Sequence, residues 1–341
     1  MKAIVERVIE GVARARAPKE PPVPAGPIVD GRDNLERPAC PLCGNTRAKP
    51  LVVARDTWVE GRDTYSVVRC EVCAHRYTTP RFKEAVKHLA FEGDYPFYTR
   101  AREVRGGRRV DRAEARRPFE GRADRLRATT SQAGRVLDIG CGDGFFLDAM
   151  RVRGWSVVGT DVEADVVWHA NEVLDIDASV CDLERDPLPE GPFEAVTMWG
   201  VLQLLYRPQR ALEQVRELLT DDGILAIGVS NIDSTGARLF GPRWRGLGVP
   251  RHLSHFTPNT LERLLAWSGF EVVHVHHETP RWIVAHSADD ALVGPASRLA
   301  KAALVPALGV AGRTRYGDTM EVYARRISQS GSHVATMNAT P

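Results

Sequence analysis

The stretch Val136-Leu137-Asp138-Ile139-Gly140-Cys141-Gly142-Asp143-Gly144-Phe145-Phe146-Leu147 decides the fold of this chain. An apolar, β-branched run ends in an acid and three glycines at alternate positions, and an apolar segment follows. This pattern predicts a strand, a tight turn and the start of a helix. The glycines allow the backbone to approach a ligand closely, because no Cβ intervenes. The stretch therefore indicates an open α/β sheet that binds its ligand at the carboxyl ends of its strands.

The spacing of the glycines bears on which ligand this turn holds. A dinucleotide-binding turn has the spacing G-x-G-x-x-G, in which the third glycine packs the helix against the strand. Here the spacing is G-x-G-x-G, and Asp138 lies two residues before Gly140. The stretch resembles the first motif of the class I S-adenosylmethionine-dependent methyltransferases, in which the acid and glycines hold the methionine end of the cofactor. A nicotinamide cofactor remains the alternative at this point.

The composition is that of an ordinary globular protein. The chain has 341 residues, of which 43% are hydrophobic and 26% charged, and its net charge of +2 gives no general attraction to nucleic acid. Its longest apolar run, 302–312, is interrupted by Pro306 and is shorter than the roughly 20 residues that span a bilayer. The N-terminus lacks the basic-then-apolar pattern of a secretory signal. We therefore expect a cytoplasmic protein without a membrane span.

Four of the six cysteines form two C-x-x-C pairs, Cys40 with Cys43 and Cys70 with Cys73. Without a secretion signal, this pattern favours metal over disulfides. Each pair can give two thiolates to one tetrahedral ion, and two pairs complete its shell. The residues between the pairs include strand-like pieces at 50–54 and 65–69. The sequence predicts a zinc ribbon whose four cysteines are structural ligands, so that His75 is not needed as a ligand.

An arginine-rich segment lies between the ribbon and the glycine turn. Residues 100–127 contain eleven arginines and five acids, and Gly106, Gly107 and Pro118 predict short helices at most. One interpretation is a solvated helix that leads into the first strand. The other is that some arginines meet an anionic acceptor, such as a phosphate-bearing sugar or an RNA backbone.

Two further acids follow later predicted strands. Asp161 ends the strand predicted at 155–160, 21 residues after Gly140, where an acid can bind both ribose hydroxyls. Asp182 and Leu183 follow the next strand end, at a position that in the resembling family receives the adenine. Asp161 supports a nucleoside ligand of either kind, so it does not separate methyltransferase from dehydrogenase.

The segments after Asp182 separate the two cofactor hypotheses. We expect a strand at 193–199 that ends in Trp199, a helix at 208–219 that begins with Pro208 and stops at Gly223, and a strand at 224–231. In sequence order these are similar to the later segments of the methyltransferase family, and no comparable similarity to a dehydrogenase is found. The ribbon and the stretch Thr78-Thr79-Pro80-Arg81 are also similar to bacterial members of this family.

The resemblance implies a cofactor and the residues that bind it. The cofactor is S-adenosylmethionine, and Trp199 is expected near its methionine end. The implied contact residues are Asp138, Gly140, Cys141, Gly142, Asp161, Val162, Asp182, Leu183 and Trp199. Cys141 and Cys181 are expected to be buried thiols beside the cofactor.

The acceptor side is expected after the strand at 224–231, in an irregular segment at 232–256. Methyl transfer to a hydroxyl or an enolisable carbon is helped by a base, for which histidine is the usual choice. The similar sugar C-methyltransferases place a histidine near the acceptor in a stretch that matches His252 to Phe256. His252 is our candidate general base, with His255 beside it. Arg251 and His255 depart from the glutamate and tyrosine of those enzymes, and Leu204 stands where relatives often have histidine.

The C-terminal part completes the expected sheet. We expect a capped helix from Thr257 to Ser268, strands at 270–275 and within 318–325, and an apolar helix at 296–308 that packs or forms a dimer. The fold class is α/β, with a Rossmann-like, mostly parallel sheet of seven strands whose last strand is antiparallel, as the family implies. The expected divisions are a flexible segment 1–37, a zinc ribbon 38–82, an arginine-rich helical connector 83–130, a methyltransferase domain 131–326 and a disordered tail 327–341.

These observations predict an S-adenosylmethionine-dependent methyltransferase that acts on a small-molecule acceptor, by O- or C-methylation, as a monomer or homodimer. Nucleic acid is not the expected partner. Two alternatives remain open. An RNA base methyltransferase would explain the ribbon and the arginines. A non-catalytic protein that binds the cofactor or a partner would explain the missing histidine at Leu204.

Overall fold

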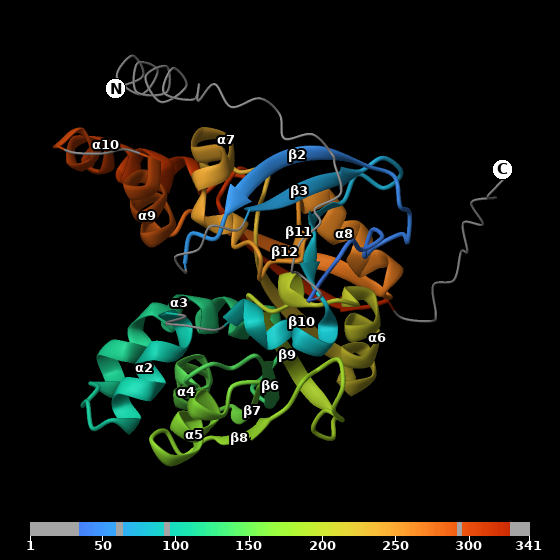
Figure 1. Cartoon of the computed structure of the whole chain (residues 1–341). Helices are drawn as coiled ribbons and strands as arrows, with labels where there is room; N and C mark the ends of the chain where they lie inside the picture. The colour runs from blue at the N-terminus through green and yellow to red at the C-terminus, as the bar shows by residue number, and fades with distance from the viewer. Residues whose placement is uncertain (1–33, 59–63, 92–95, 292–294, 328–341) are drawn as a thin grey trace, which may run out of the picture.

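The computed structural model describes residues 34–58, 64–91, 96–291 and 295–327. These residues form a seven-stranded sheet, a four-stranded antiparallel sheet and a two-stranded sheet, with helices packed around them (Figure 1). The helical face expected in 1–16, and the tail beyond residue 327, lie outside the described residues. In the described part of the chain, no helix is both long enough and apolar enough to cross a membrane.

The seven-stranded sheet confirms the predicted fold class. All neighbouring pairs are parallel except those of the last strand, which is antiparallel to both of its neighbours. The order across the sheet is β12 (Phe270–Glu278), β13 (Thr319–Arg326), β10 (Leu219–Ser230), β9 (Phe193–Trp199), β6 (Arg135–Ile139), β7 (Ser156–Asp161) and β8 (Asp177–Val180). This order places β6, which precedes the glycine turn, between β9 and β7.

Alternate residues of the central strands supply two separate cores, because successive side chains of a strand point to opposite faces. Leu137 of β6 packs with α6 (Pro208–Leu218) and α8 (Pro258–Trp267). Its neighbour Val136 packs on the other face, with α3 (Arg112–Thr129), α4 (Phe145–Val152) and α5 (Ala164–Glu172). The sheet is therefore covered by helices on both faces, as a parallel sheet requires.

The arginine-rich connector is more helical than we predicted. It holds η1 (Glu84–Phe91), α2 (Pro96–Arg105) and the 18-residue α3, which runs through Pro118. Pro118 removes one backbone donor and usually disrupts a helix interior. Here Asp111 caps the helix by accepting from the N–H of Glu114, and Leu126 is fully buried against the sheet. Tertiary packing thus overrides the local signal, and the prediction of short helices was wrong.

Two buried carboxylates hold α3 in place. Asp148 on α4 pairs with Arg112 and Arg116 of α3, and Glu321 on β13 pairs with Arg122 and Arg125. The side chains of Asp148 and Glu321 are only 1–2% exposed. The arginines around Glu321 hold the pKa of its carboxyl below the usual range although burial opposes this. One interpretation of the sequence was that arginines of this segment meet an anionic acceptor. These four arginines are instead paired with acids of the chain.

Two smaller predictions about the second half were also wrong. Helix α6 ends at Leu218, and Gly223 lies within β10 instead of stopping the helix. The segment 232–256 is not irregular throughout. It contains α7 (Thr235–Phe240), η3 (Gly241–Arg243), η4 (Arg245–Leu247) and β11 (Ser254–His255).

A buried acid gives the segment 232–256 its order. Asp318 accepts hydrogen bonds from the Ser234 hydroxyl and the Trp244 indole, each at 2.7 Å. All three side chains are buried. The predicted helix that follows is confirmed as α8, with Thr257 as its N-cap and Pro258 in its first turn.

The ribbon is built into the same body as the large sheet. Its strands β2 (Ala48–Arg55), β3 (Thr64–Cys70) and β4 (Arg76–Thr79) contain the strand-like pieces that we predicted. The fourth strand of this sheet is β11, which belongs to the segment that carries His252 and His255. A further antiparallel pair, β1 (Leu35–Glu36) with β5 (Arg81–Phe82), joins the two ends of the zinc ribbon. Residues 35–36, assigned to the flexible segment from sequence, thus form a strand.

A third core joins the ribbon to the C-terminal helices. Val67 of the ribbon, Trp244 of the segment 232–256 and Ile283 of α9 (Arg281–Ala291) belong to one buried cluster. Leu304 and Leu308 of α10 (Pro295–Ala311) complete it. Figure 1 shows this group, with β2 and β3 in blue beside α7, α9 and α10 in orange to red. The ribbon, the segment 232–256 and α9–α10 thus share one packed unit, which we call the cap.

The Glu321 cluster generates a stability prediction. Replacing Glu321 with Gln should lower the free energy of unfolding by about 3 kcal/mol, because two partly buried arginines lose a buried partner. Urea unfolding would measure this change. The matched control is Glu217→Gln, which removes an exposed pair with Arg216 and should cost less than about 1 kcal/mol. Equal effects of the two substitutions would contradict this account of α3.

Candidate functional site

The turn after β6 adopts the conformation that its glycines allow. Gly140, Gly142 and Gly144 have φ values of 74°, 54° and 84°, in the left-handed region that other residues rarely adopt. A Cβ on Gly140 would lie 2.3 Å from Val201, so the loop after β9 packs directly against the turn. A Cβ on Gly142 would meet nothing within 4 Å. The backbone at Gly142 is therefore open to a ligand.

Asp161 ends β7 and is bound to the glycine turn. One carboxylate oxygen accepts from the N–H of Gly142 at 2.9 Å, and the other accepts from the N–H of Glu163 at 3.0 Å. Burial raises the pKa of Asp161 from its usual value, against these two hydrogen bonds. Val162, the next residue, is 55% exposed. Asp161 thus fixes the turn, and Val162 offers an apolar side chain beside it.

Asp138 lies within β6, fully buried next to the same turn. It accepts a hydrogen bond of 2.6 Å from the hydroxyl of Thr197 on β9. Burial raises the pKa of Asp138 to about 7, with a smaller contribution from the nearby charge of Asp161. A carboxyl with this pKa changes its charge near neutral pH, so its affinity for a cationic group depends on pH.

Asp182 follows β8 and already has a cationic partner. Its carboxylate lies 2.6 Å from the ammonium of Lys87 on η1. The N–H of Glu184 also donates to it, at 3.2 Å. Its neighbour Leu183 is buried in the core shared with α6 and α8. A ligand that contacts Asp182 therefore meets Lys87 as well, which the sequence did not indicate.

Trp199 ends β9, and Cys141 lies within the turn after β6. The Trp199 ring packs edge-on against Phe146 at 5.2 Å, and the guanidinium of Arg122 lies 4.4 Å from its centre. Cys141 is buried, as predicted, and burial raises the pKa of its thiol well above the usual value. Cys181 is buried as well. Both thiols are therefore protonated and unreactive at neutral pH.

The connector approaches the same edge of the sheet. Arg100 on α2 lies 3.2 Å from Asp143 of the glycine turn, and Lys87 reaches Asp182. Eight of the eleven arginines in 100–127 form ion pairs with acids of this chain: Arg100, Arg102, Arg105, Arg108, Arg112, Arg116, Arg122 and Arg125. Few arginines of this segment remain to bind a phosphate backbone.

His252 is held in one tautomer by a chain of hydrogen bonds. The N–H of Ser230 donates to Oε1 of Gln203, so the amide nitrogen of Gln203 faces Nε2 of His252 at 2.8 Å and donates to it. Nδ1 of His252 then carries the proton and donates to the carbonyl of Gly246 at 3.2 Å. Burial and the charge of Arg251 lower the pKa of His252 to about 4. The ring is neutral at pH 7, with its lone pair on Nε2.

His255 faces the ribbon. The hydroxyl of Thr78 donates to the carbonyl of His252 at 2.6 Å, so Nε2 of His255, at 2.9 Å, must donate to that hydroxyl. Burial lowers the pKa of His255 well below its usual value. Arg251 is also buried, and it donates to the carbonyl of Ala90 and pairs with Asp56 of the ribbon. The two histidines thus have different partners: His252 contacts the loop after β9, and His255 contacts β4.

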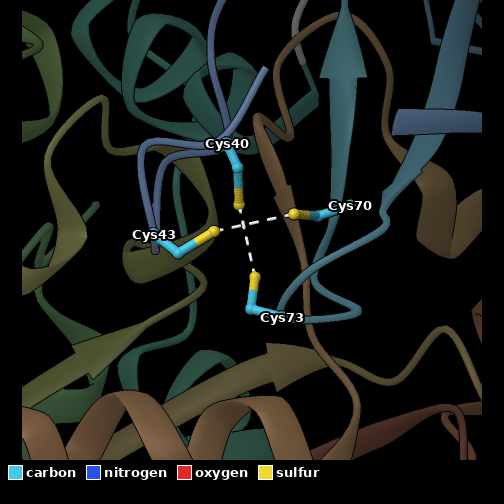
Figure 2. A group of neighbouring side chains, drawn as sticks. All are labelled: Cys40, Cys43, Cys70 and Cys73. Carbon is cyan, nitrogen blue, oxygen red and sulfur yellow. Dashed lines mark hydrogen bonds between the residues drawn. The ribbon is translucent and has the colours of Figure 1, made fainter. Parts of the chain in front are cut away.

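The four ribbon cysteines converge on one point, as Figure 2 shows. Cys40 and Cys73 have their sulfurs 3.5 Å apart, those of Cys43 and Cys70 are 3.6 Å apart, and all four lie within 4.8 Å of one another. Four sulfurs at about 2.3 Å from a zinc ion would be about 3.8 Å apart. The cluster therefore fits a tetrahedral zinc ion. The ring of His75 lies instead against Phe256, at 5.3 Å.

Sequence reasoning missed three residues of this site: Lys87, Gln203 and Thr78. Lys87 lies in a connector without a motif, and nothing in its surroundings in the sequence pairs it with Asp182. Gln203 could have been found, because it stands next to the position where relatives often have histidine. Thr78 lies in the stretch Thr78-Thr79-Pro80-Arg81, which is similar to bacterial family members but to which no function was assigned from the sequence. Its contacts become visible only when β4 and β11 are paired.

Comparison with known proteins gives the family. Residues 111–275 match the sequence model of the methyltransferase domain family. A malonyl-[acyl-carrier protein] O-methyltransferase of Geobacter sulfurreducens is 27% identical over 216 residues, which cover 59% of this chain and 80% of that protein. A ubiquinone biosynthesis O-methyltransferase of a Chelativorans species is 27% identical over 46% of this chain, which spans only 61% of that relative's length.

Among solved structures, a 1,6-didemethyltoxoflavin-N1-methyltransferase of Burkholderia thailandensis is similar over 82% of this chain and 100% of its own, with 16% identity and a TM-score of 0.47. The family match covers the glycine turn, Asp161 and Asp182, and it agrees with the sheet order and the carboxyl-edge acids described above. From these observations, the chain is an S-adenosylmethionine-dependent methyltransferase that carries a four-cysteine cluster near its N-terminus.

Proposed function

We propose that this enzyme transfers the methyl group of S-adenosylmethionine to an oxygen or carbon atom of a small-molecule acceptor. The observation that carries the proposal is the convergence of the glycine turn, Asp161 and Asp182 at the carboxyl ends of three adjacent parallel strands, β6, β7 and β8. The named activities of the relatives above, which are O-methyltransferases, support an oxygen acceptor.

The donor would be held by the residues that the family resemblance implies. Asp138 and the turn Gly140-Cys141-Gly142 would bind the methionine end, with Trp199 beside it. Asp161 would bind the ribose hydroxyls, and the adenine would lie among Val162, Asp182 and Leu183. The bound donor supplies an electrophilic methyl group on a sulfonium. The open backbone at Gly142 and the anionic groups on both sides of it suit that cation.

His252 is the candidate general base. Its neutral ring presents the Nε2 lone pair toward the loop after β9, where Gln203 now donates to it. An acceptor hydroxyl would take the place of the Gln203 amide and give its proton to Nε2 as its oxygen bonds to the methyl group. The methyl–sulfur bond of the donor would break in the same step, and the sulfur would leave as a neutral thioether. His255 would have a supporting part, because its ring and the carbonyl of His252 share the Thr78 hydroxyl.

A small-molecule acceptor is favoured over RNA because most arginines of 100–127 form ion pairs within the chain. Eight of the eleven arginines in 100–127 are paired with acids within the chain, and the net charge of the whole chain is only +2. A protein that binds a phosphate backbone keeps its basic residues free on one face. The ribbon also has a sufficient role without RNA, because it holds the segment with His252 through Thr78.

The four cysteines would bind a structural zinc ion. Cys40, Cys70 and Cys73 are buried in the core shared with α6 and α8, so the ion would stabilise the ribbon and the neighbouring core together. All four ligand positions are filled by thiolates, which leaves no open position for a substrate. We therefore propose a structural zinc and no part for it in methyl transfer.

Donor binding should depend on pH through Asp138. Its pKa of about 7 predicts that affinity for S-adenosylmethionine rises between pH 6 and 8, by up to about tenfold, because only the ionised carboxyl attracts the cationic donor. Titration calorimetry at several pH values would measure this. Asp138→Asn should bind weakly at every pH and lose the pH dependence. A variant that binds as tightly as the parent would remove Asp138 from the site.

The test of the proposed function is transfer of a labelled methyl group into an extract of small molecules. We expect a labelled product, and its identification would give the acceptor atom. His252→Ala should lower transfer by about 10²–10⁴-fold with donor affinity unchanged, since it removes only the base. At saturating donor, the rate should not fall between pH 8 and 6 through His252, because its pKa is about 4.

The control for His252 is His286→Ala, which removes an exposed histidine of α9 and should leave transfer unchanged. Full transfer by His252→Ala would exclude the histidine as a base and leave the methyltransferase assignment intact. Label recovered only in RNA would instead support the alternative function.

Zinc should be lost when the cluster is broken. Cys70→Ser should reduce bound zinc, measured by mass spectrometry of the metal, from about one equivalent to a small fraction, and should lower the unfolding temperature. The matched control is Cys181→Ser, which alters a buried thiol outside the cluster and should retain the metal. Stoichiometric zinc in the Cys70 variant would show that the cluster is not the zinc site.

A further inference from the structure

One face of α10 is apolar and open to solvent. Leu299, Ala303, Pro306 and Val310 follow one another at helical spacing, and all four are exposed, with Leu299 at 77% and Val310 at 70%. The opposite face of the helix packs Leu304 and Leu308 into the cap. These four exposed residues form what we call the α10 stripe. An exposed apolar stripe of this kind is a candidate binding surface.

Basic residues lie along one side of the stripe, and we call them the basic rim. A groove of about 660 Å³ beside α10 is lined by Val305, Pro306 and Val310 and by three basic residues, Arg281, Lys301 and Arg313. Among the residues that the structure describes, Arg281 and Arg313 form no ion pair, whereas Lys301 pairs with Asp289. The sequence of α10 contains Arg298 and Lys301 and no acid.

We propose that the α10 stripe and its basic rim dock this enzyme on a bilayer surface that contains anionic phospholipids. A helix with an apolar face and basic residues at its borders can lie in the plane of the membrane interface, with the apolar face among the upper acyl chains. Arg281, Arg298 and Arg313 would then meet the phosphate groups. The surface would bind peripherally, at the level of the headgroups and upper acyl chains.

Charge favours this occupant over a second copy of the chain. In a two-fold dimer the same patch faces itself, so the basic groups of both copies would be gathered at one interface. The rim has an excess of basic groups, and Asp289 already pairs with Lys301. Like charges brought together in this way destabilise the contact. An anionic surface instead meets the rim with opposite charge along its whole length.

The α10 stripe lies at the same edge of the sheet as the proposed methyl-transfer site. Strand β12 is antiparallel to β13, which is antiparallel to β10, so β12 runs parallel to the cofactor-side strands and ends at the same edge. Helix α9 begins three residues after β12 ends, and α10 packs on it. The α10 stripe thus lies on the cap, the unit that also holds His252 at this edge of the sheet.

The test is co-sedimentation of the full chain with vesicles. Vesicles of phosphatidylcholine with about one third phosphatidylglycerol should bind the protein, and vesicles of phosphatidylcholine alone should bind it at least about fivefold less. Raising the salt from about 0.1 M to 0.5 M should release much of the protein, because the charge attraction is screened. Failure to bind the anionic vesicles at low salt would overturn the proposal.

Variants assign the binding to this face. Leu299→Glu combined with Val310→Glu should lower partitioning about tenfold or more, and Arg313→Glu should lower it at least about fivefold. The matched controls are Val152→Glu on α4, where Val152 is 61% exposed, and Arg117→Glu on α3. Neither control should change binding. Equal losses in the stripe variants and the controls would show that no particular face is used.

Two measurements on the free protein test the other occupants. A dimer seen by light scattering and broken by Leu299→Glu would assign the stripe to a second copy. Cross-links from Lys301 to Lys2 or Lys19 that block vesicle binding would assign it to the N-terminal segment of the same chain. Either result would overturn the membrane proposal. Donor binding, measured in parallel, should be unchanged in every stripe variant, so the proposal can fail without affecting the assigned activity.

Discussion

The left-handed turn after β6 is the constraint on which the site depends. Three glycines with positive φ let the chain leave the strand, pass close to the loop after β9 at Val201, and begin α4 within a few residues. A side chain at Gly140 would collide with Val201, and Asp161 binds the backbone N–H of Gly142 from the neighbouring strand. The carboxyl ends of three strands are thereby drawn to one place, which presents fixed carboxylates and open backbone.

The ribbon contacts the segment that carries His252 and His255 directly. Its strand β4 pairs with β11, and the Thr78 hydroxyl bridges the carbonyl of His252 and the ring of His255. From the other direction, Gln203 fixes the ring of His252 in the tautomer that leaves Nε2 free of a proton. The histidine therefore lies between an element organised by four cysteines and the loop that follows the cofactor strands. The ribbon therefore packs directly against the segment that carries the candidate base.

The sequence predicted those parts of the structure that depend on local patterns. The glycine turn, the strands of the seven-stranded sheet, β2 and β3 of the zinc ribbon, the N-cap of α8 and the cysteine cluster were found where the residues indicated them. Strands β4 and β11 were not predicted. The pairing of distant segments was not predictable, because the partners of Asp182, Thr78 and the connector arginines are set by the folded arrangement. Pro118 shows the same limit, since its helix persists through packing and buried ion pairs that no local signal reveals. The sequence thus offered candidate residues for the site, whereas their contacts with one another follow only from the folded structure.

The pairing of β4 with β11 has a consequence for synthesis of the chain. Thr78 and His255 are 177 residues apart, so the ribbon leaves the ribosome long before its fourth strand exists. During that interval β4 has an unpaired edge, which is a surface prone to pairing with other chains. Early capture of a metal ion by the four cysteines would hold the two C-x-x-C turns together over this period. Metal supply in the producing cell would then influence the yield of folded enzyme separately from its catalytic rate.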